Sequence, residues 1–203
     1  MTVTIQVYAD YVCPFCFLAE FPLQAAIADK DVQVEWMPFE LRPLPHETLR
    51  PDGSYLQRAW RESVYPTAKQ LGVFIVLPQI SPQPYTHLAL EGLQFAKEHG
   101  QGNSYSDRIF RAFFQEEQDI GQIDVLTRLA GEIGLDAAEY RDALVSRRYQ
   151  ATHQQALRYA CDEVEVTSVP TFIIGEYQIP GLVAQSQLEE VISLAMEPPS
   201  QSS

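Results

Sequence analysis

Positive charge is scarce in this sequence. Lysine and arginine together number 14, aspartate and glutamate together number 27, and the formal net charge at pH 7 is -13. A surface with this surplus of negative charge repels phosphate backbones and anionic lipid headgroups. We therefore expect neither a nucleic acid nor a membrane surface to be a partner of this protein.

The sequence also lacks a long apolar run and a recognisable leader. Its longest apolar stretch, residues 73–77, is far too short to cross a bilayer. The N-terminus enters a predicted strand directly, without the basic and apolar regions of a secretory signal. Three cysteines among 203 residues are too few for a disulfide scaffold. We therefore expect a cytoplasmic protein in which any disulfide is catalytic.

Two of the three cysteines nevertheless stand close together, in Cys13-Pro14-Phe15-Cys16. Residues 3–8 before them alternate and are rich in β-branched and aromatic side chains, which predicts a strand. After them, apolar residues recur at the spacing of one helix face, namely Phe17, Leu18, Phe21, Ala25 and Ala28. Proline is favoured at the first helical position, so Pro14 places Cys13 at the N-cap and Cys16 in the first turn.

This placement predicts thiol redox chemistry. Unpaired backbone N–H groups and the positive end of the helix dipole favour a thiolate at Cys13, which makes it the expected nucleophile. Cys16, deeper in the helix, is expected to resolve the mixed disulfide that Cys13 forms with a substrate. Two alternatives stay open. A zinc site needs a second pair of ligands, which Cys161 and the scattered histidines do not supply, and mere core packing leaves the strand–Cys–Pro–helix arrangement unexplained.

The rest of the chain predicts one more strand, a long helical stretch, and a final hairpin and helix. Residues 32–36 alternate as a strand, and helices are expected over 55–71, 87–99, from 106, over 125–133 and from 136 to 160. Strands return at 171–174 and 177–179 around Gly175-Glu176, before a helix over 185–196. We expect Phe110, Phe113 and Phe114 to lie in the core and Cys161 to be a buried packing residue.

Four segments carry a resemblance to a known family: YADYVCPFC at residues 8–16, WMPFEL at 36–41, IFRAFF at 109–114 and VPTF at 169–172. Together with the order of elements, they resemble the DsbA-like branch of the thioredoxin superfamily, most closely its FrnE-like members. The resemblance implies an α/β, thioredoxin-like fold with a large inserted all-helical domain. It implies a discontinuous thioredoxin-like domain of residues 1–45 and 163–198, a helical insertion of residues 46–162, and a polar tail of residues 199–203.

The resemblance also implies the composition of the site. The proline of the VPTF segment is expected to be cis and to stand beside Cys13 and Cys16, which makes Pro170 the third catalytic position. A turn of this kind exposes the backbone of Val169 for pairing with an extended substrate segment. Pro14, Phe15 and Asp10 complete the expected substrate-binding set. Asp10, three residues before Cys13, is suited to relaying a proton, contacting a substrate or capping a turn.

Three function classes follow from these residues. The first is a thiol-disulfide oxidoreductase acting on disulfide or dithiol proteins, peptides or glutathione, with no metal, no tightly bound cofactor, and glutathione as a candidate redox partner. The second is a glutathione-dependent isomerase or transferase for small aromatic compounds, similar to 2-hydroxychromene-2-carboxylate isomerase and its kappa-class relatives. Those relatives often carry serine at the site, so the retained Cys16 counts against this class. The third is a binding or chaperone-like module. Either a monomer or a homodimer is expected.

The sequence departs from the branch at one motif of the insertion. Members commonly carry Asn-Thr, two further residues and then Ala-His, whereas this chain reads Tyr85-Thr86-His87-Leu88-Ala89-Leu90. Leu90 therefore occupies the position of the usual histidine. Any substrate or glutathione contact that the branch makes through that histidine is not expected here.

Overall fold

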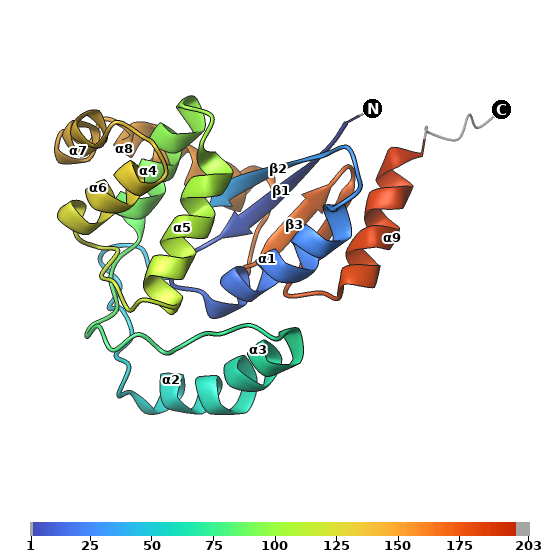
Figure 1. Cartoon of the computed structure of the whole chain (residues 1–203), viewed down its shortest axis with the longest axis horizontal. Coiled ribbons are helices and arrows are strands. Elements are labelled where there is room, and N and C mark those ends of the chain that lie inside the picture. The colour runs from blue at the N-terminus through green and yellow to red at the C-terminus, as the bar shows by residue number, and fades with distance from the viewer. Residues whose placement is uncertain (1, 198–203) are drawn as a thin grey trace.

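A mixed four-stranded sheet forms the centre of the computed structural model, which describes residues 2–197 (Figure 1). The strands lie in the order β2-β1-β3-β4, with bounds β1 Val3–Ala9, β2 Val32–Pro38, β3 Thr171–Ile174 and β4 Tyr177–Pro180. β1 is parallel to β2 and antiparallel to β3, and Val7 of β1 stands opposite both Trp36 and Phe172. The predicted hairpin is confirmed, because β3 and β4 pair across Gly175 and Glu176.

Helices cover both faces of this sheet. On one face, α1 (Pro14–Ile27) packs beside α9 (Gln185–Met196), as Figure 1 shows. Alternation along β1 decides which side chains face them: Ile5 and Val7 join the main core. Tyr8 points to the opposite face, where it packs with Ala160 and Val166. The arrangement is a thioredoxin-like α/β fold with a helical insertion, as the sequence predicts.

The insertion supplies the remaining helices between β2 and β3. Their bounds are α2 Ser54–Ala59, η1 Trp60–Val64, α3 Tyr65–Leu71, α4 His87–Glu98, α5 Gly102–Phe114, α6 Ile123–Glu132, α7 Ala137–Val145, α8 Gln150–Arg158 and η2 Tyr159–Glu163, where η marks a π-helical turn. In Figure 1, α2 and α3 lie below α1 and α5, apart from the group formed by α4, α6, α7 and α8. The domain boundaries at residues 45 and 162 stay a prediction.

One helix prediction is wrong. The expected helix from 136 to 160 is two helices, α7 and α8, because the chain turns between Ser146 and Tyr149. Arg147 takes the left-handed conformation there, with φ of 54°. Its left-handed backbone ends the helical hydrogen-bond pattern without the glycine or proline that normally signals a helix end. The start was predicted correctly, since Asp136 is the N-cap and accepts from the amides of Ala138 and Glu139.

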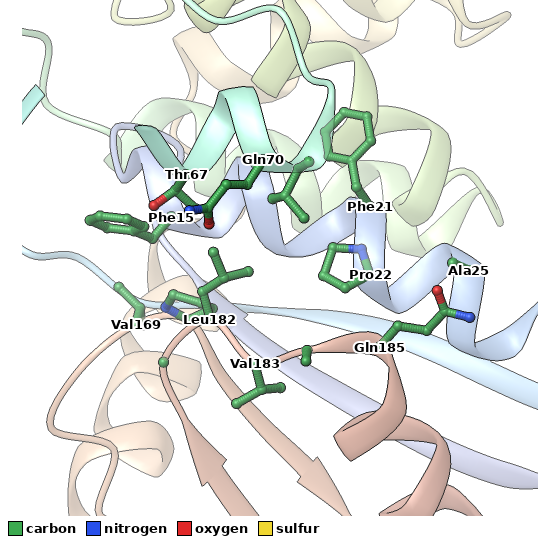
Figure 2. Close-up of a pocket in the computed structure, with 14 residues that line it drawn as sticks. Phe15, Phe21, Pro22, Ala25, Thr67, Gln70, Val169, Leu182, Val183 and Gln185 are labelled. Atoms are coloured by element: carbon green, nitrogen blue, oxygen red, sulfur yellow. The ribbon is translucent and has the colours of Figure 1, made fainter. Parts of the chain in front are cut away.

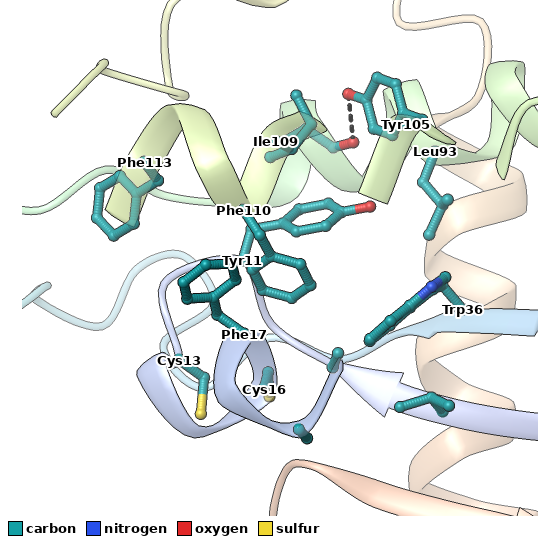
Figure 3. Close-up of a cluster of buried hydrophobic side chains, with 14 of the residues drawn as sticks. Tyr11, Cys13, Cys16, Phe17, Trp36, Leu93, Tyr105, Ile109, Phe110 and Phe113 are labelled. Atoms are coloured by element: carbon teal, nitrogen blue, oxygen red, sulfur yellow. Dashed lines mark hydrogen bonds between the residues drawn. The ribbon is translucent and has the colours of Figure 1, made fainter. Parts of the chain in front are cut away.

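A cluster of aromatic side chains packs between the insertion and the thioredoxin-like core (Figure 3). Phe110 of α5 lies with its ring centroid 5.0 Å from Tyr11 and 5.5 Å from Trp36, and Phe114 stacks on Phe17 of α1 at 5.6 Å. The predicted core placement of Phe110, Phe113 and Phe114 is confirmed, since all three are fully buried. Tyr11 belongs to the turn before Cys13, so this cluster also supports the thiol site.

The described residues contain neither a membrane-spanning helix nor a cluster of metal-binding side chains. Among the helices of residues 2–197, none is long and apolar enough to cross a membrane. Within the same range, no group of three or more histidine, cysteine, aspartate or glutamate side chains is arranged to hold a metal ion. The predicted polar tail, residues 199–203, lies outside the described residues.

Candidate active site

Cys13 lies at the end of the connection between β1 and α1. It is the N-cap of α1 with extended backbone angles, φ of -88° and ψ of 111°, and Pro14 follows at the first helical position. Its amide donates to the Asp10 carbonyl at 3.0 Å, and its carbonyl accepts from the Cys16 amide at 3.1 Å. The predicted N-cap position of Cys13 and first-turn position of Cys16 are therefore confirmed.

The two thiols differ in their surroundings. Both are free thiols and lie near each other in the first turn of α1 (Figure 3), with Cys13 5% exposed and Cys16 fully buried. Burial raises the pKa of Cys16 well above its ordinary value, and the neighbouring Cys13 and the charge of Asp10 raise it further. Cys16 therefore keeps its proton at neutral pH. Cys13 stands instead at the N-terminus of α1, where the first backbone N–H groups have no partner within the helix.

The VPTF segment lies against the Cys13 thiol. The Val169–Pro170 peptide bond is cis, and the Cys13 thiol donates a hydrogen bond to the Val169 carbonyl, with Sγ and O 3.6 Å apart. Pro170 is buried, and its carbonyl accepts from the Gly181 amide at 2.7 Å. Residues 156 positions apart in the chain are thus brought together at one site.

Asp10 is the buried carboxyl group of the site, with 1% of its surface exposed. Its oxygens accept from the amide of Leu41 at 2.7 Å and from that of Val12 at 3.5 Å. Burial raises its pKa to about 6, hydrogen bonds from Leu41 and Thr86 oppose that rise, and the charge of Glu40 adds to it. Asp10 therefore changes its charge close to neutral pH, beside the buried thiol of Cys16.

Two hollows flank the Cys13 turn. One is a largely apolar groove of about 870 Å³ between α1, α3 and the segment 181–185, with Phe15 and Val169 near one end (Figure 2). The other is a smaller cavity of about 160 Å³, lined by Asp10, Cys13, Trp60 and Phe15 among others. Phe15 borders both hollows and is half-buried rather than fully exposed. The predicted substrate-binding residues Val169, Pro14, Phe15 and Asp10 all line one or both of them.

The third cysteine is not where the sequence pattern predicts it. Cys161 is exposed, so its predicted role as a buried packing residue is wrong. It lies in η2, where the wider π-helical turn shifts the register relative to an α-helix, and Ala160 takes the fully buried position instead. Cys161 has no part in the thiol site.

Sequence reasoning missed a pair of residues behind Asp10. Glu40 follows β2, His153 lies on α8, and their side chains are 2.7 Å apart from Oε1 to Nε2 although 113 positions separate them. Leu90, at the position of the usual branch histidine, is buried. His87, one turn earlier, lies with this pair around a separate hollow rather than beside the thiols.

Comparison with known families gives one match over almost the whole chain. The model of the DSBA-like thioredoxin domain matches residues 4–193. A curated relative, the uncharacterized protein YwbO of Bacillus subtilis (strain 168), is 53% identical over 194 residues, which cover 95% of this chain and 97% of that protein.

Solved structures agree on the fold. A probable DsbA oxidoreductase from Streptomyces coelicolor superposes with a TM-score of 0.83 at 21% identity, covering 97% of this chain and 92% of the other. A 2-hydroxychromene-2-carboxylate isomerase gives 0.74 at 17% identity, covering 94% and 93%. The cytosolic disulfide reductase DsbM from Pseudomonas aeruginosa, solved with GSH, gives 0.68 at 20% identity, covering 95% of both chains. At these identities the likeness shows the fold alone.

Proposed function

Because the chain belongs to the DSBA-like thioredoxin domain family, we propose that it is a thiol-disulfide oxidoreductase that works through Cys13 and Cys16. The main support for this proposal is the contrast between the two thiols. Cys16 is fully buried and keeps its proton, whereas Cys13 lies at the N-terminus of α1 and against the Val169 carbonyl. Such an asymmetric pair separates the attacking thiol from the resolving thiol.

The first step is attack by Cys13 on a substrate disulfide. The Cys13 thiolate forms a bond to one substrate sulfur, the substrate S–S bond breaks, and the other sulfur leaves as a thiolate that takes a proton from solvent. The helix N-terminus stabilises the starting thiolate. The product is a mixed disulfide between Cys13 and the substrate.

The second step closes the protein disulfide. Ionised Asp10 takes the proton of Cys16, the Cys16 sulfur attacks Cys13, and the mixed disulfide breaks to release the second substrate thiolate, which is then protonated. The substrate has gained two electrons and the protein dithiol has lost two. The reverse sequence uses the same residues to oxidise a substrate dithiol.

The apolar groove lined by Phe15 and Val169 suits an extended protein or peptide segment. Because Cys13 lies against the Val169 carbonyl, the same end of the groove also suits glutathione as the partner that restores the thiols. The likeness to a cytosolic disulfide reductase solved with GSH supports the glutathione partner and a cytoplasmic setting. Catalysis requires neither a metal nor a tightly bound cofactor in this proposal.

A second candidate function is glutathione-dependent isomerisation of a small aromatic compound. The observation that favours it is the cavity of about 160 Å³ next to Cys13, closed by the buried Trp60, in a fold shared with 2-hydroxychromene-2-carboxylate isomerase. That reaction does not require Cys16 as a resolving thiol, because no disulfide is closed.

Replacing Cys16 by serine separates the two candidates. The comparison is made in a Cys161→Ser background, which removes the exposed third thiol. We expect the Cys16→Ser protein, treated with glutathione disulfide, to stop at a mixed disulfide between Cys13 and glutathione, because no other cysteine remains to resolve it. The protein that keeps Cys16 passes on to the Cys13–Cys16 disulfide. Mass spectrometry after quenching distinguishes the two products. Equal accumulation of the glutathione adduct in both proteins would favour the isomerase.

Replacing Asp10 by asparagine is expected to lower activity and raise stability. The folded pKa of about 6 exceeds the ordinary 3.8, so folding favours the neutral carboxyl group, and its contribution to stability is lost as the pH rises from about 4 through about 6. At pH 7 the amide should therefore stabilise the fold by about 3 kcal/mol. Closure of the disulfide should slow by about a hundredfold because the proton acceptor is gone.

Urea unfolding and quenched alkylation at pH 5 and pH 7.5 measure the two effects of the Asp10→Asn change. The stability gain should be smaller at the lower pH, where part of the wild-type Asp10 is already neutral. A variant that loses stability at both pH values, or closes the disulfide at the wild-type rate, would contradict this role of Asp10.

A further inference from the structure

A second group of ionisable side chains lies behind the thiol site, where α4 and α8 meet the segment after β2. Glu40, His87, Glu91, Arg147 and His153 surround a hollow of about 340 Å³. Within this group, the side chains of Glu40 and His153 are 7% and 2% exposed. Burying a charged side chain costs free energy unless a well-placed partner forms a hydrogen bond with it. The burial of Glu40 therefore depends on the position of His153.

The peptide unit after Glu40 reaches the thiol site directly. The Leu41 amide, which is bonded to the Glu40 carbonyl carbon, donates to Asp10 at 2.7 Å. On the other side of Glu40, the Phe39 amide donates to the Ala9 carbonyl at 3.0 Å. The position of Glu40 therefore fixes the direction of the Leu41 N–H group. A chain of short contacts runs from His153 through Glu40 and Leu41 to Asp10.

The hydrogen bonding of His153 favours one arrangement of its protons. Its Nε2 lies 2.7 Å from Glu40, whereas its Nδ1 is buried without a partner. A buried N–H without an acceptor is costly, so the hydrogen belongs on Nε2, where it is donated to the Glu40 carboxylate. The Glu40 side chain is thereby held in place.

Among residues 2–197, no lysine or arginine forms a salt bridge with Glu40. The Arg147 guanidinium is held by Glu91, at 2.9 Å from Nε and 2.6 Å from Nη2. On α4, burial and the charge of Arg147 lower the pKa of His87, which keeps it neutral at neutral pH. The charge of Glu40 acts on Arg147 and His87, and it also raises the pKa of Asp10. Asp10 also lines a cavity with Cys13, raises the pKa of Cys16 through its charge, and accepts a hydrogen bond from the side chain of Thr86. The Tyr11 hydroxyl, which feels the charge of Asp10, pairs with Ser106.

We propose that Glu40 and His153 are a positioning pair that aims the Leu41 N–H group at Asp10, fixes the charge beside it, and so controls how readily Cys16 closes the disulfide. The pair deepens the proposed oxidoreductase function and rests on it. Neither side chain touches the substrate or the reacting sulfurs. Their effect is transmitted through one peptide unit and one carboxyl group.

Two variants are expected to act in opposite directions on the pH dependence of disulfide closure. In the wild type the rate should rise with pH through about 6 as Asp10 ionises. Glu40→Gln removes the charge that opposes ionisation of Asp10, so the rise should move to lower pH by about half a unit or more. His153→Leu removes the hydrogen bond that holds Glu40, which loosens the neighbouring Leu41 N–H group. The hydrogen bond from Leu41 to ionised Asp10 is then weaker, so the rise should move to higher pH. His153→Gln, which keeps a donor, should restore the wild-type profile.

A matched control makes the same Glu→Gln change in another hydrogen-bonded pair at α8. Glu98 of α4 accepts a hydrogen bond from Tyr149, the N-cap of α8, and is not bonded to the segment after β2. Glu98→Gln should leave the pH profile of closure unchanged. A merely structural role for Glu40 would make the Glu40→Gln and Glu98→Gln profiles alike.

The experiment mixes each reduced protein, in a Cys161→Ser background, with excess glutathione disulfide at a series of pH values on either side of 6. Acid quenching, alkylation and mass spectrometry then give the rate of Cys13–Cys16 closure. Displacement of the Glu40→Gln profile to lower pH, with Glu98→Gln unchanged, supports the pair. If the wild-type protein closes its disulfide but the pH profile of Glu40→Gln is not displaced, the positioning role of Glu40 and His153 is wrong and the oxidoreductase function is unaffected. Absence of any closure in the wild type overturns the oxidoreductase itself.

Discussion

Replacing Cys13 by serine should abolish thiol-disulfide exchange. Cys13 is the thiol at the N-cap of α1, where the helix N-terminus stabilises an anion, and a serine hydroxyl in the same place forms no covalent bond to sulfur under these conditions. We expect the rate of reduction of a peptide disulfide to fall on the order of a thousandfold or more, the scale seen when a covalent nucleophile is removed. Release of free thiols from the substrate gives the rate.

The matched control for this prediction is Cys161→Ser. Cys161 is exposed in η2 and outside the thiol site, so its replacement should leave the rate unchanged. If Cys13→Ser keeps a substantial part of the activity, or if Cys161→Ser loses it, Cys13 is not the nucleophile.

Replacing Phe110 by alanine should strongly destabilise the fold. Phe110 is fully buried and lies against Tyr11, Phe17 and Trp36, so the change leaves a cavity where the insertion meets the thioredoxin-like core. A change of this kind costs about 3–5 kcal/mol, against a total stability of about 5–15 kcal/mol for a typical domain. The midpoint of urea unfolding, followed by circular dichroism, should fall accordingly.

Phe74→Ala is the control for the Phe110 substitution, because Phe74 is 65% exposed. It should change the free energy of unfolding by about 0.5 kcal/mol or less. Equal destabilisation by the two substitutions would show that the aromatic cluster does not hold the insertion in place. Because Tyr11 belongs to the turn before Cys13, we expect Phe110→Ala to slow thiol exchange as well.

The local part of the site could be predicted from the sequence because its signals are local. Pro14 at the first helical position and the apolar spacing after it placed Cys13 and Cys16 correctly on α1. The strand pattern on either side of Gly175 likewise identified the hairpin. The approach of the VPTF segment to Cys13 had no such local signal, and it was expected only through the family resemblance.

The remainder of the site depends on contacts between distant segments. No periodicity or spacing pairs Glu40 with His153 across 113 positions, and neither residue type is unusual in its segment. The left-handed Arg147 and the π-helical turn at Cys161 were missed for a related reason, since both interrupt a helical pattern without glycine or proline. Buried polar pairs and irregular turns therefore had to come from the structure.

A redox titration of the protein shows whether Cys13 and Cys16 form an intramolecular disulfide. Protein with Cys161 replaced by serine is equilibrated in graded glutathione buffers, quenched and alkylated, and its free thiols are counted by mass spectrometry. We expect a reversible transition in which Cys13 and Cys16 lose their thiols together as an intramolecular disulfide. A transition in which Cys13 alone is modified by glutathione, while Cys16 stays a thiol throughout, would contradict it.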